Sequence, residues 1–313
     1  MAETLKHKPT HWVKIREAGV LSGMRFMVAA YRLSGRTVFT VLLFPVMVYY
    51  YLRRGAARKA SMDYVQRVQH YFPELYGRRS ARLLSFGQFL KFGQSLLDKY
   101  LAWARTPEIP DMDTAQQEQL FDIIDTKQGC LILGSHYGNI EYSRGVATRH
   151  PDLAINVLIY DQHAAKFAQL MTESEPDSRM NLIQVTDLDT SLALSLKEKV
   201  ERGEWVVIAG DRVPVNEGSR VCNALFLGEP APFPIGPYVL AALLKCPVYL
   251  LHCYLQDGHY HMELDLFERE FSLSRANRQA SFEAYAGRYA AALEAQVRRD
   301  PMQWFNFFDF WGQ

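Results

Sequence analysis

Strand-length apolar runs alternate with helical stretches from about residue 122 onward. Five runs have the length and character of buried strands: CLILGS, AINVLIY, MNLIQV, EWVVIAG and CPVYLLHCYL. The stretches with a helical pattern are IEYSRGVATRH, AAKFAQLMT, DTSLALSLKEKVERG and GPYVLAALLKC. This alternation is typical of α/β folds, so it predicts a central sheet flanked by helices.

An Asp257-Gly258 turn predicts a hairpin that joins Val248–Leu255 to His259–Leu266. The hairpin adds an antiparallel strand, so the sheet is expected to be mixed. A last helix is predicted over residues 278–299, and it leads into the aromatic tail PMQWFNFFDFW.

The residues before this α/β part have their own pattern. Apolar residues at helical spacing predict helices over residues 56–103, with a break at Phe72-Pro73. A second break at residues 106–110 marks entry into the α/β part. We therefore predict an N-terminal anchoring segment, residues 1–55, and a main domain, residues 56–313, which is helical over 56–105 and α/β over 106–313.

The anchoring segment contains fifteen residues without a charge, from Val38 to Leu52. This run is shorter than the roughly 20 residues of a straight bilayer-spanning helix, and Pro45 is expected to kink it. Arginines flank the run on both sides and three tyrosines end it, as at a membrane interface. We favour a monotopic anchor that enters the membrane, with a single span as the close alternative and a buried core helix as the third.

Composition excludes one class of partner and favours one compartment. The formal net charge is +1, so the chain lacks the basic field of a nucleic-acid-binding protein. Its four cysteines form no CxxC pair, and this favours reduced residues facing a cytosol. The N-terminus has no apolar core or small-residue cleavage site of a secretory signal peptide.

The first candidate site follows the CLILGS run, in the sequence GSHYGNIE. His136 stands at the end of a predicted strand, and Asn139 and Glu141 stand where the next helix begins. On one continuous helix His136 and Glu141 would point in different directions, so the turn is expected to let the carboxylate reach the imidazole. A carboxylate-held histidine is suited to take a proton from a hydroxyl. A strand-end histidine that only caps or packs is the alternative.

Asn139 of this turn is also a candidate for binding a substrate, and two further patches are candidates as well. Asp211 and Arg212 follow the EWVVIAG strand, at the end where α/β sheets place ligands; an ordinary surface ion pair is the alternative. The loop 226–238 contains Phe233 and Gly236, which suit a pocket wall or an anion contact, although a structural loop fits equally well. His252, His259 and His261 lack a second ligand pair at zinc spacing, so we expect no metal.

These motifs together resemble a known family. His136 and Glu141 match the H-x4-D/E signature of the lysophospholipid and glycerolipid acyltransferases, and the form GSHYGNIE is most similar to the late lipid A (lauroyl/myristoyl) acyltransferase branch. VVIAGDR, FLGEPAPFPIG and the Pro-x-x-Trp of DPMQWFNFFDFW resemble later marks of that branch, in order. The ordered set covers most of the chain.

The resemblance implies a glycerolipid acyltransferase-like fold and transfer of a fatty acyl chain at the inner (plasma) membrane, on its cytoplasmic side. It implies acyl carrier protein or acyl-CoA as donor, a lipid or glycolipid hydroxyl as acceptor, His136 and Glu141 as the catalytic pair, and no cofactor. The chain has no G-x-S-x-G elbow, which argues against a triad hydrolase. A hydrolase that uses the same pair, or a non-catalytic lipid-binding subunit, are the alternatives.

Overall fold

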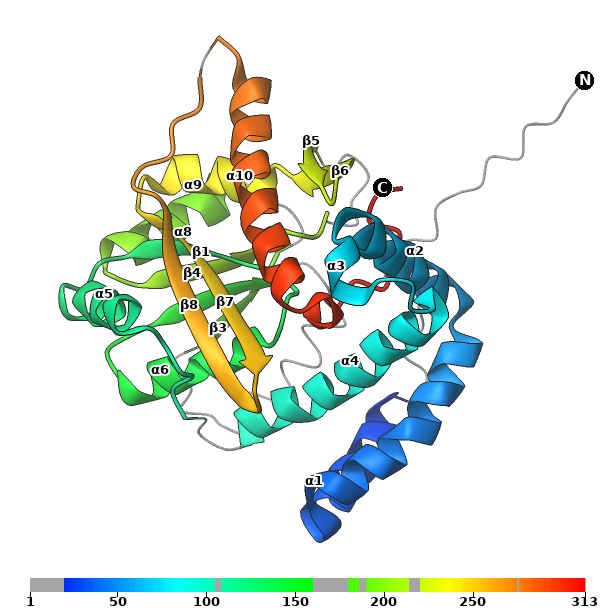
Figure 1. Cartoon of the computed structure of the whole chain (residues 1–313). Coiled ribbons are helices and arrows are strands. Elements are labelled where there is room, and N and C mark those ends of the chain that lie inside the picture. The colour runs from blue at the N-terminus through cyan, green and yellow to red at the C-terminus, as the bar shows by residue number, and fades with distance from the viewer. Residues whose placement is uncertain are drawn as a thin grey trace, which may run out of the picture. The chain divides into compact units, whose positions relative to one another are not determined.

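The computed structural model describes residues 20–104, 108–159, 180–185, 190–213, 220–274 and 276–312 (Figure 1). The helix predicted over AAKFAQLMT lies outside these residues. The described residues divide into two compact units, one made of residues 20–94 and 306–312 and the other lying within residues 95–305. The domain boundary at residue 55 stays a prediction.

The first unit is helical. Its elements are α1 (Val20–Arg53), α2 (Gly55–Tyr71), α3 (Pro73–Tyr76) and the first half of α4 (Ala81–Ala104). The break expected at Phe72-Pro73 is confirmed, because Pro73 begins α3. Within α1 the helical dihedrals are interrupted at Gly35 (φ 78°, ψ −175°) and not at Pro45, where we expected the kink. Glycine adopts this positive φ without a steric penalty, so the helix changes direction there.

Close packing and aromatic contacts hold this unit together. Gly93 of α4 lets α1 approach, because a Cβ at this position would lie 2.8 Å from Leu43 Cδ1. In the C-terminal tail, the ring of Phe307 lies 4.6 Å from that of Phe89, and the Arg67 guanidinium lies 4.4 Å above the ring of Trp311. The tail therefore completes the core of the helices that begin the chain.

The second unit is built on a six-stranded mixed sheet, as the sequence predicts (Figure 1). The strands are β1 (Cys130–Gly134), β2 (Ile155–Ile159), β3 (Met180–Gln184), β4 (Trp205–Ala209), β7 (Val248–Gln256) and β8 (His259–Glu268). Their order is β3-β2-β4-β1-β7-β8, and only β8 runs antiparallel to its neighbour. Asp257 and Gly258 both have positive φ, which confirms the predicted hairpin turn.

Helices cover both faces of this sheet. One face packs against α5 (Thr114–Asp125) and α6 (Arg144–Arg149), with Ile132 and Val207 in the shared core. The other face packs against α8 (Thr190–Glu201), α9 (Gly236–Leu244) and α10 (Arg278–Arg299). The helix predicted over residues 236–246 is confirmed as α9, which ends at Leu244, and the helix predicted over 278–299 is confirmed as α10. The helix α5, capped by Asp113, had no counterpart in our prediction.

The loop expected at 226–238 is partly a strand. Residues Glu229–Pro234 form β6, which pairs antiparallel with β5 (Val221–Phe226). Prolines stand at every second position of β6, at Pro230, Pro232 and Pro234. Alternate N–H groups of an edge strand point away from its partner, so these positions need no donor. Proline has no backbone N–H, so three prolines suggested a loop. At these alternate positions they fit an edge strand instead.

Candidate active site

The ends of β1 and β4 bring two candidate residues together. In the parallel register Gly134 pairs with Ala209, and the Gly210 N–H continues the pairing by donating to the Gly134 carbonyl oxygen (3.0 Å). His136 and Asp211 each stand two residues beyond these paired positions. Equal offsets on neighbouring parallel strands place both side chains at the same edge of the sheet.

Asp211 holds His136 through both of its oxygens. Oδ1 lies 2.7 Å from His136 Nδ1, and Oδ2 accepts from the His136 backbone N–H (2.7 Å) and from Trp304 Nε1 (3.0 Å). These three hydrogen bonds fix the carboxylate and with it the orientation of the imidazole. They favour the tautomer with the proton on Nδ1, which leaves Nε2 able to accept a proton.

Burial and charge set the protonation states of the pair. Asp211 is 1% exposed, and burial alone would raise its pKa, but the imidazole of His136 and the hydrogen bonds lower that pKa to about 2. Desolvation and the Arg212 charge lower the pKa of His136, and Asp211 opposes them. The pair therefore exists near neutral pH as an ionised carboxylate and a neutral imidazole, which is the state a general base requires.

The turn after His136 is fixed by backbone contacts. The Gly138 N–H donates to the Gln303 carbonyl oxygen (2.9 Å), the Asn139 N–H to Cys253 O (2.7 Å), and the Phe305 N–H to His136 O (3.0 Å). Gly138 has φ +70°, and a Cβ there would lie 2.0 Å from the Cys253 oxygen. Only glycine fits this position, so the turn is locked between β7 and the segment 303–305.

Glu141 has a different partner from the one expected. It lies in the short 3-10 helix η2 (Ile140–Ser143), and its Oε1 is 2.5 Å from Lys99 Nζ. Among the described residues no hydrogen bond or ion pair joins Glu141 to His136. We expected Glu141 to orient the imidazole, whereas in the structure Asp211 stands in that position. The reason is topological, because β4 lies next to β1 whereas η2 directs Glu141 toward α4.

The remaining candidates differ in their surroundings. Arg212 Nη2 donates to Phe305 O (3.3 Å), so the guanidinium lies beside the residue that binds the His136 carbonyl. Phe233 is fully buried between the rings of Phe226 and Tyr289, and Gly236 begins α9. Phe233 thus packs the core beneath the site, and its role in binding a substrate, like that of Gly236, stays a prediction.

Two residues near the site were not in our candidate set. Trp304 is 1% exposed and donates to Asp211, and Lys99 pairs with Glu141. Trp304 could have been recognised from the sequence, since it belongs to the Pro-x-x-Trp pattern of the tail. Lys99 could not have been recognised, because no sequence pattern distinguishes a single lysine on a helix from a solvated one.

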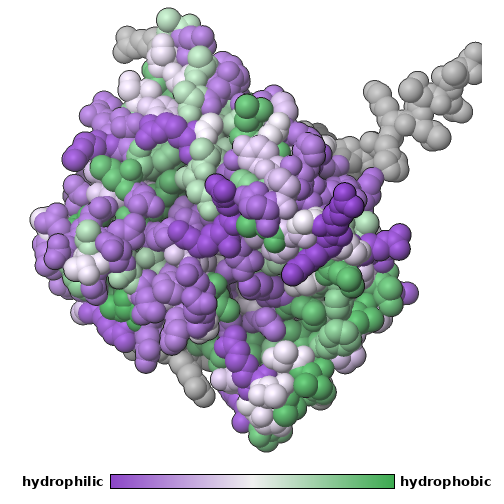
Figure 2. Space-filling model, viewed as in Figure 1, coloured by the Kyte–Doolittle hydropathy of each residue, from purple (hydrophilic) through white to green (hydrophobic). Residues whose placement is uncertain are grey.

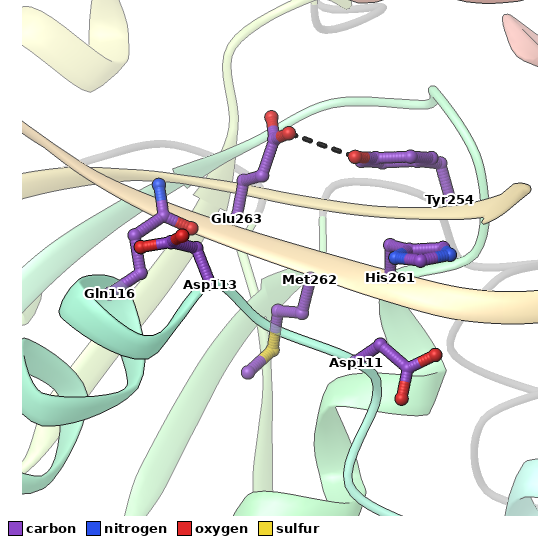
Figure 3. A pocket seen from close by; sticks show the side chains of 7 residues that line it. All are labelled: Asp111, Asp113, Gln116, Tyr254, His261, Met262 and Glu263. Atoms are coloured by element: carbon purple, nitrogen blue, oxygen red, sulfur yellow. Dashed lines mark hydrogen bonds between the residues drawn. The ribbon is translucent and has the colours of Figure 1, made fainter.

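A hollow of about 270 Å³ lies at the edge of β8 (Figure 3). It is lined by Asp111, Asp113, Gln116, Tyr254, His261, Met262 and Glu263. The rings of Tyr254 and His261 are stacked 5.7 Å apart, and the Tyr254 hydroxyl donates to Glu263 (2.8 Å). His261, one of the three histidines weighed for a metal, lines this hollow, whereas none of the predicted catalytic or substrate-binding residues does. Within the described residues no group of three or more His, Cys, Asp or Glu side chains is arranged to hold a metal ion.

Comparison with known proteins identifies the family. The family model for the bacterial lipid A biosynthesis acyltransferases matches residues 84–312, which include β1, β4 and the tail that supplies Trp304. A search of curated proteins gives no match. Since the matched segment covers well over half of the chain and contains every residue of the site described above, the chain belongs to the bacterial lipid A biosynthesis acyltransferase family and is an acyltransferase.

Proposed function

We propose that this acyltransferase moves a fatty acyl chain from an acyl thioester, on acyl carrier protein or CoA, to a hydroxyl group of a lipid or glycolipid acceptor. The observation that carries the proposal is the His136 imidazole held by Asp211 through Nδ1, with Nε2 outside that hydrogen bond. The family gives the reaction class, and the arrangement supports His136 as the base that the reaction needs.

The reaction requires one base and no enzyme nucleophile. His136 Nε2 takes the proton of the acceptor hydroxyl as its oxygen attacks the thioester carbonyl. The tetrahedral oxyanion collapses, the carbon–sulfur bond breaks, and the imidazolium returns the proton to the thiolate. Asp211 stays ionised throughout and stabilises the imidazolium, as in other His–Asp pairs.

Arg212 and Lys99 add positive charge around the base. Both cations lower the pKa of His136, Arg212 more than Lys99, so both act on the imidazole electrostatically. In this proposal Arg212 binds an anionic part of donor or acceptor, such as a phosphate, through its planar fork. In this proposal Asn139 stays a substrate-binding residue, although it is only 2% exposed.

We place the reaction at a membrane. In the described part of the chain, Ala29–Arg53 is a helix long and apolar enough to cross a bilayer, and only 17% of its apolar window is buried. A lipid acceptor is reached most directly by an enzyme whose α1 enters the same bilayer. We propose an inner membrane location with the second unit on the cytoplasmic side, where an acyl carrier protein or CoA donor is available.

The experiment that tests this proposal measures the products of the reaction as well as the consumption of the acyl donor. Purified enzyme is given an acyl thioester with and without a membrane lipid extract, and mass spectrometry separates acylated lipid from free fatty acid. We expect acylated lipid from the wild type, a loss of about 10² to 10⁴ in rate for His136→Ala, and normal activity for the exposed hairpin variant His259→Ala. Free fatty acid as the main product would show a hydrolase, and normal turnover by His136→Ala would refute the base.

A further inference from the structure

Tyr289 of α10, the helix that lies over one face of the sheet (Figure 1), binds the carbonyl group at which β1 ends. Its hydroxyl donates to the Gly134 oxygen (2.8 Å), and the same oxygen accepts the Gly210 N–H (3.0 Å). His136 follows Gly134 by two positions, and Asp211 follows Gly210 by one. The hydroxyl therefore joins the last backbone contact between β1 and β4 before the His136–Asp211 pair.

The backbone at both strand ends is closely packed. A Cβ at Gly210 would lie 2.8 Å from Tyr289 Cζ. A Cβ at Gly134 would lie 2.9 Å from Ile140 Cδ1. The tip of the phenol ring thus rests on the backbone of Gly210 while its hydroxyl binds Gly134. One side chain from the helix layer therefore contacts both strands at the point where the site begins.

The surroundings of Tyr289 fix its ring and keep its hydroxyl a donor. Tyr289 is 1% exposed, and the Phe233 ring of β6 meets it edge to face, with the ring centroids 6.0 Å apart. Burial, and then the charge of Asp211, raise the pKa of the Tyr289 hydroxyl well above its ordinary value, so the hydroxyl stays protonated. Tyr289 is therefore a fixed, neutral donor and is not suited to act as an acid or a base.

We propose that Tyr289 is a positioning residue: it fixes the end of β1 against β4, so that His136 and Asp211 meet in the geometry of their hydrogen bond. This inference rests on the proposed function, in which His136 is the base. Catalytic groups must be held within about 0.5 Å of the productive geometry. A shift of the Gly134 carbonyl group would be passed along two residues of the same chain to the imidazole. Tyr289 prevents that shift without touching a substrate.

Removal of the hydroxyl should lower turnover and leave substrate binding in place. We expect Tyr289→Phe to lower kcat by roughly 3- to 30-fold and to change KM by less than about twofold. Tyr249→Phe is the matched control, because Tyr249 is 6% exposed and its hydroxyl donates to Gln128 Oε1 (3.2 Å) at the other end of the strands. Both variants should lower the urea midpoint of unfolding by a similar amount, and Tyr249→Phe should keep full kcat.

An NMR signal and the pH profile separate positioning from a loss of stability. The proton between His136 Nδ1 and Asp211 is expected to give a proton NMR signal at low field, which should move upfield in Tyr289→Phe and stay in place in the control variant. Asp211 raises the pKa of His136, whereas Arg212 and Lys99 lower it. A weaker hydrogen bond to Asp211 lowers this pKa, so the acidic limb of kcat/KM should move to lower pH in Tyr289→Phe.

Two results would overturn the inference. One is a Tyr289→Phe variant with the kcat, NMR signal and pH profile of the wild type, because the hydroxyl is then not needed for alignment. The other is a variant that fails to fold, or whose activity falls only in proportion to its folded fraction, because the hydroxyl then contributes to stability alone. The NMR signal is measured without substrate, so the inference can fail while the proposed function holds. The product analysis alone decides the proposed function.

Discussion

Trp304, Asp211 and His136 form a chain of hydrogen bonds in which each residue determines the state of the next. The indole N–H leaves Asp211 with a bonded, ionised carboxylate at 1% exposure, and this carboxylate fixes the imidazole. A buried charge without its donors would be costly, so the tail residue Trp304 stabilises the ionised form of Asp211. Its effect is therefore expected in both stability and pH dependence.

We predict that Trp304→Phe lowers the free energy of unfolding by about 1–3 kcal/mol, because Oδ2 of Asp211 loses a buried donor. The pKa of Asp211 should rise, so acid unfolding should begin at higher pH. Urea titration at several pH values measures both effects. Trp205→Phe is the control, since Trp205 Nε1 donates to Gln128 O (3.1 Å) at the opposite end of the strands. Trp205→Phe should lose stability but keep the activity of the folded protein. Equal losses of activity in both variants would contradict a role of Trp304 at Asp211.

The charge of Arg212 should be visible in the pH profile. Desolvation and then Arg212 lower the pKa of His136, so removal of the guanidinium should raise that pKa toward its ordinary value of 6.5. Since the base must be neutral, we expect the acidic limb of kcat/KM to move to higher pH in Arg212→Met. The exposed Arg220→Met serves as control and should leave the limb in place. If the acidic limb of Arg212→Met stays in place or moves to lower pH, the Arg212 charge does not lower the pKa of His136.

At the scale of elements, the register of β1 against β4 creates the site. Apolar runs bounded by small residues made these strands predictable, and the hairpin turn at Asp257-Gly258 fixed the antiparallel edge. Which strands would be neighbours was not predictable, because the order β3-β2-β4-β1-β7-β8 depends on long-range packing. Without that order His136 had no visible partner but Glu141, which is close in sequence. Asp211, 75 positions away, becomes its partner only in the sheet.

The turn after β1 depends on one glycine, and we predict a large effect of Gly138→Ala. A positive φ costs a residue with a Cβ roughly 1–2 kcal/mol, and the contact with Cys253 O should add roughly 1–3 kcal/mol of overpacking. Gly258→Ala has the same kind of backbone (φ +87°) with open space around its Cβ, so it should show only the first cost. Thermal unfolding of both variants measures the difference. Equal losses would mean that the turn can move away from β7.

For the whole molecule, α1 presents apolar side chains on two sides. Phe39, Leu43 and Met47 are buried, whereas Val41 and Phe44 are 67% and 53% exposed. Figure 2 shows hydrophobic surface gathered over α1. A helix that packs through one side and exposes apolar residues on the other has a surface suited to a bilayer.

We predict that Val41→Asp/Phe44→Asp weakens membrane binding without unfolding the protein. Each exposed apolar side chain contributes roughly 1.5–3 kcal/mol when it enters an apolar medium, so the double variant should lose at least about tenfold in partitioning. Sedimentation with phosphatidylethanolamine–phosphatidylglycerol vesicles measures this, and circular dichroism checks the fold. Leu83→Asp, at a position on α4 that is 72% exposed, is the matched control for adding charge to the same unit. If the double variant sediments as the wild type does, the exposed side of α1 does not enter the bilayer. If the loss instead equals that of Leu83→Asp, charge alone explains it; only a loss specific to α1 supports the anchor.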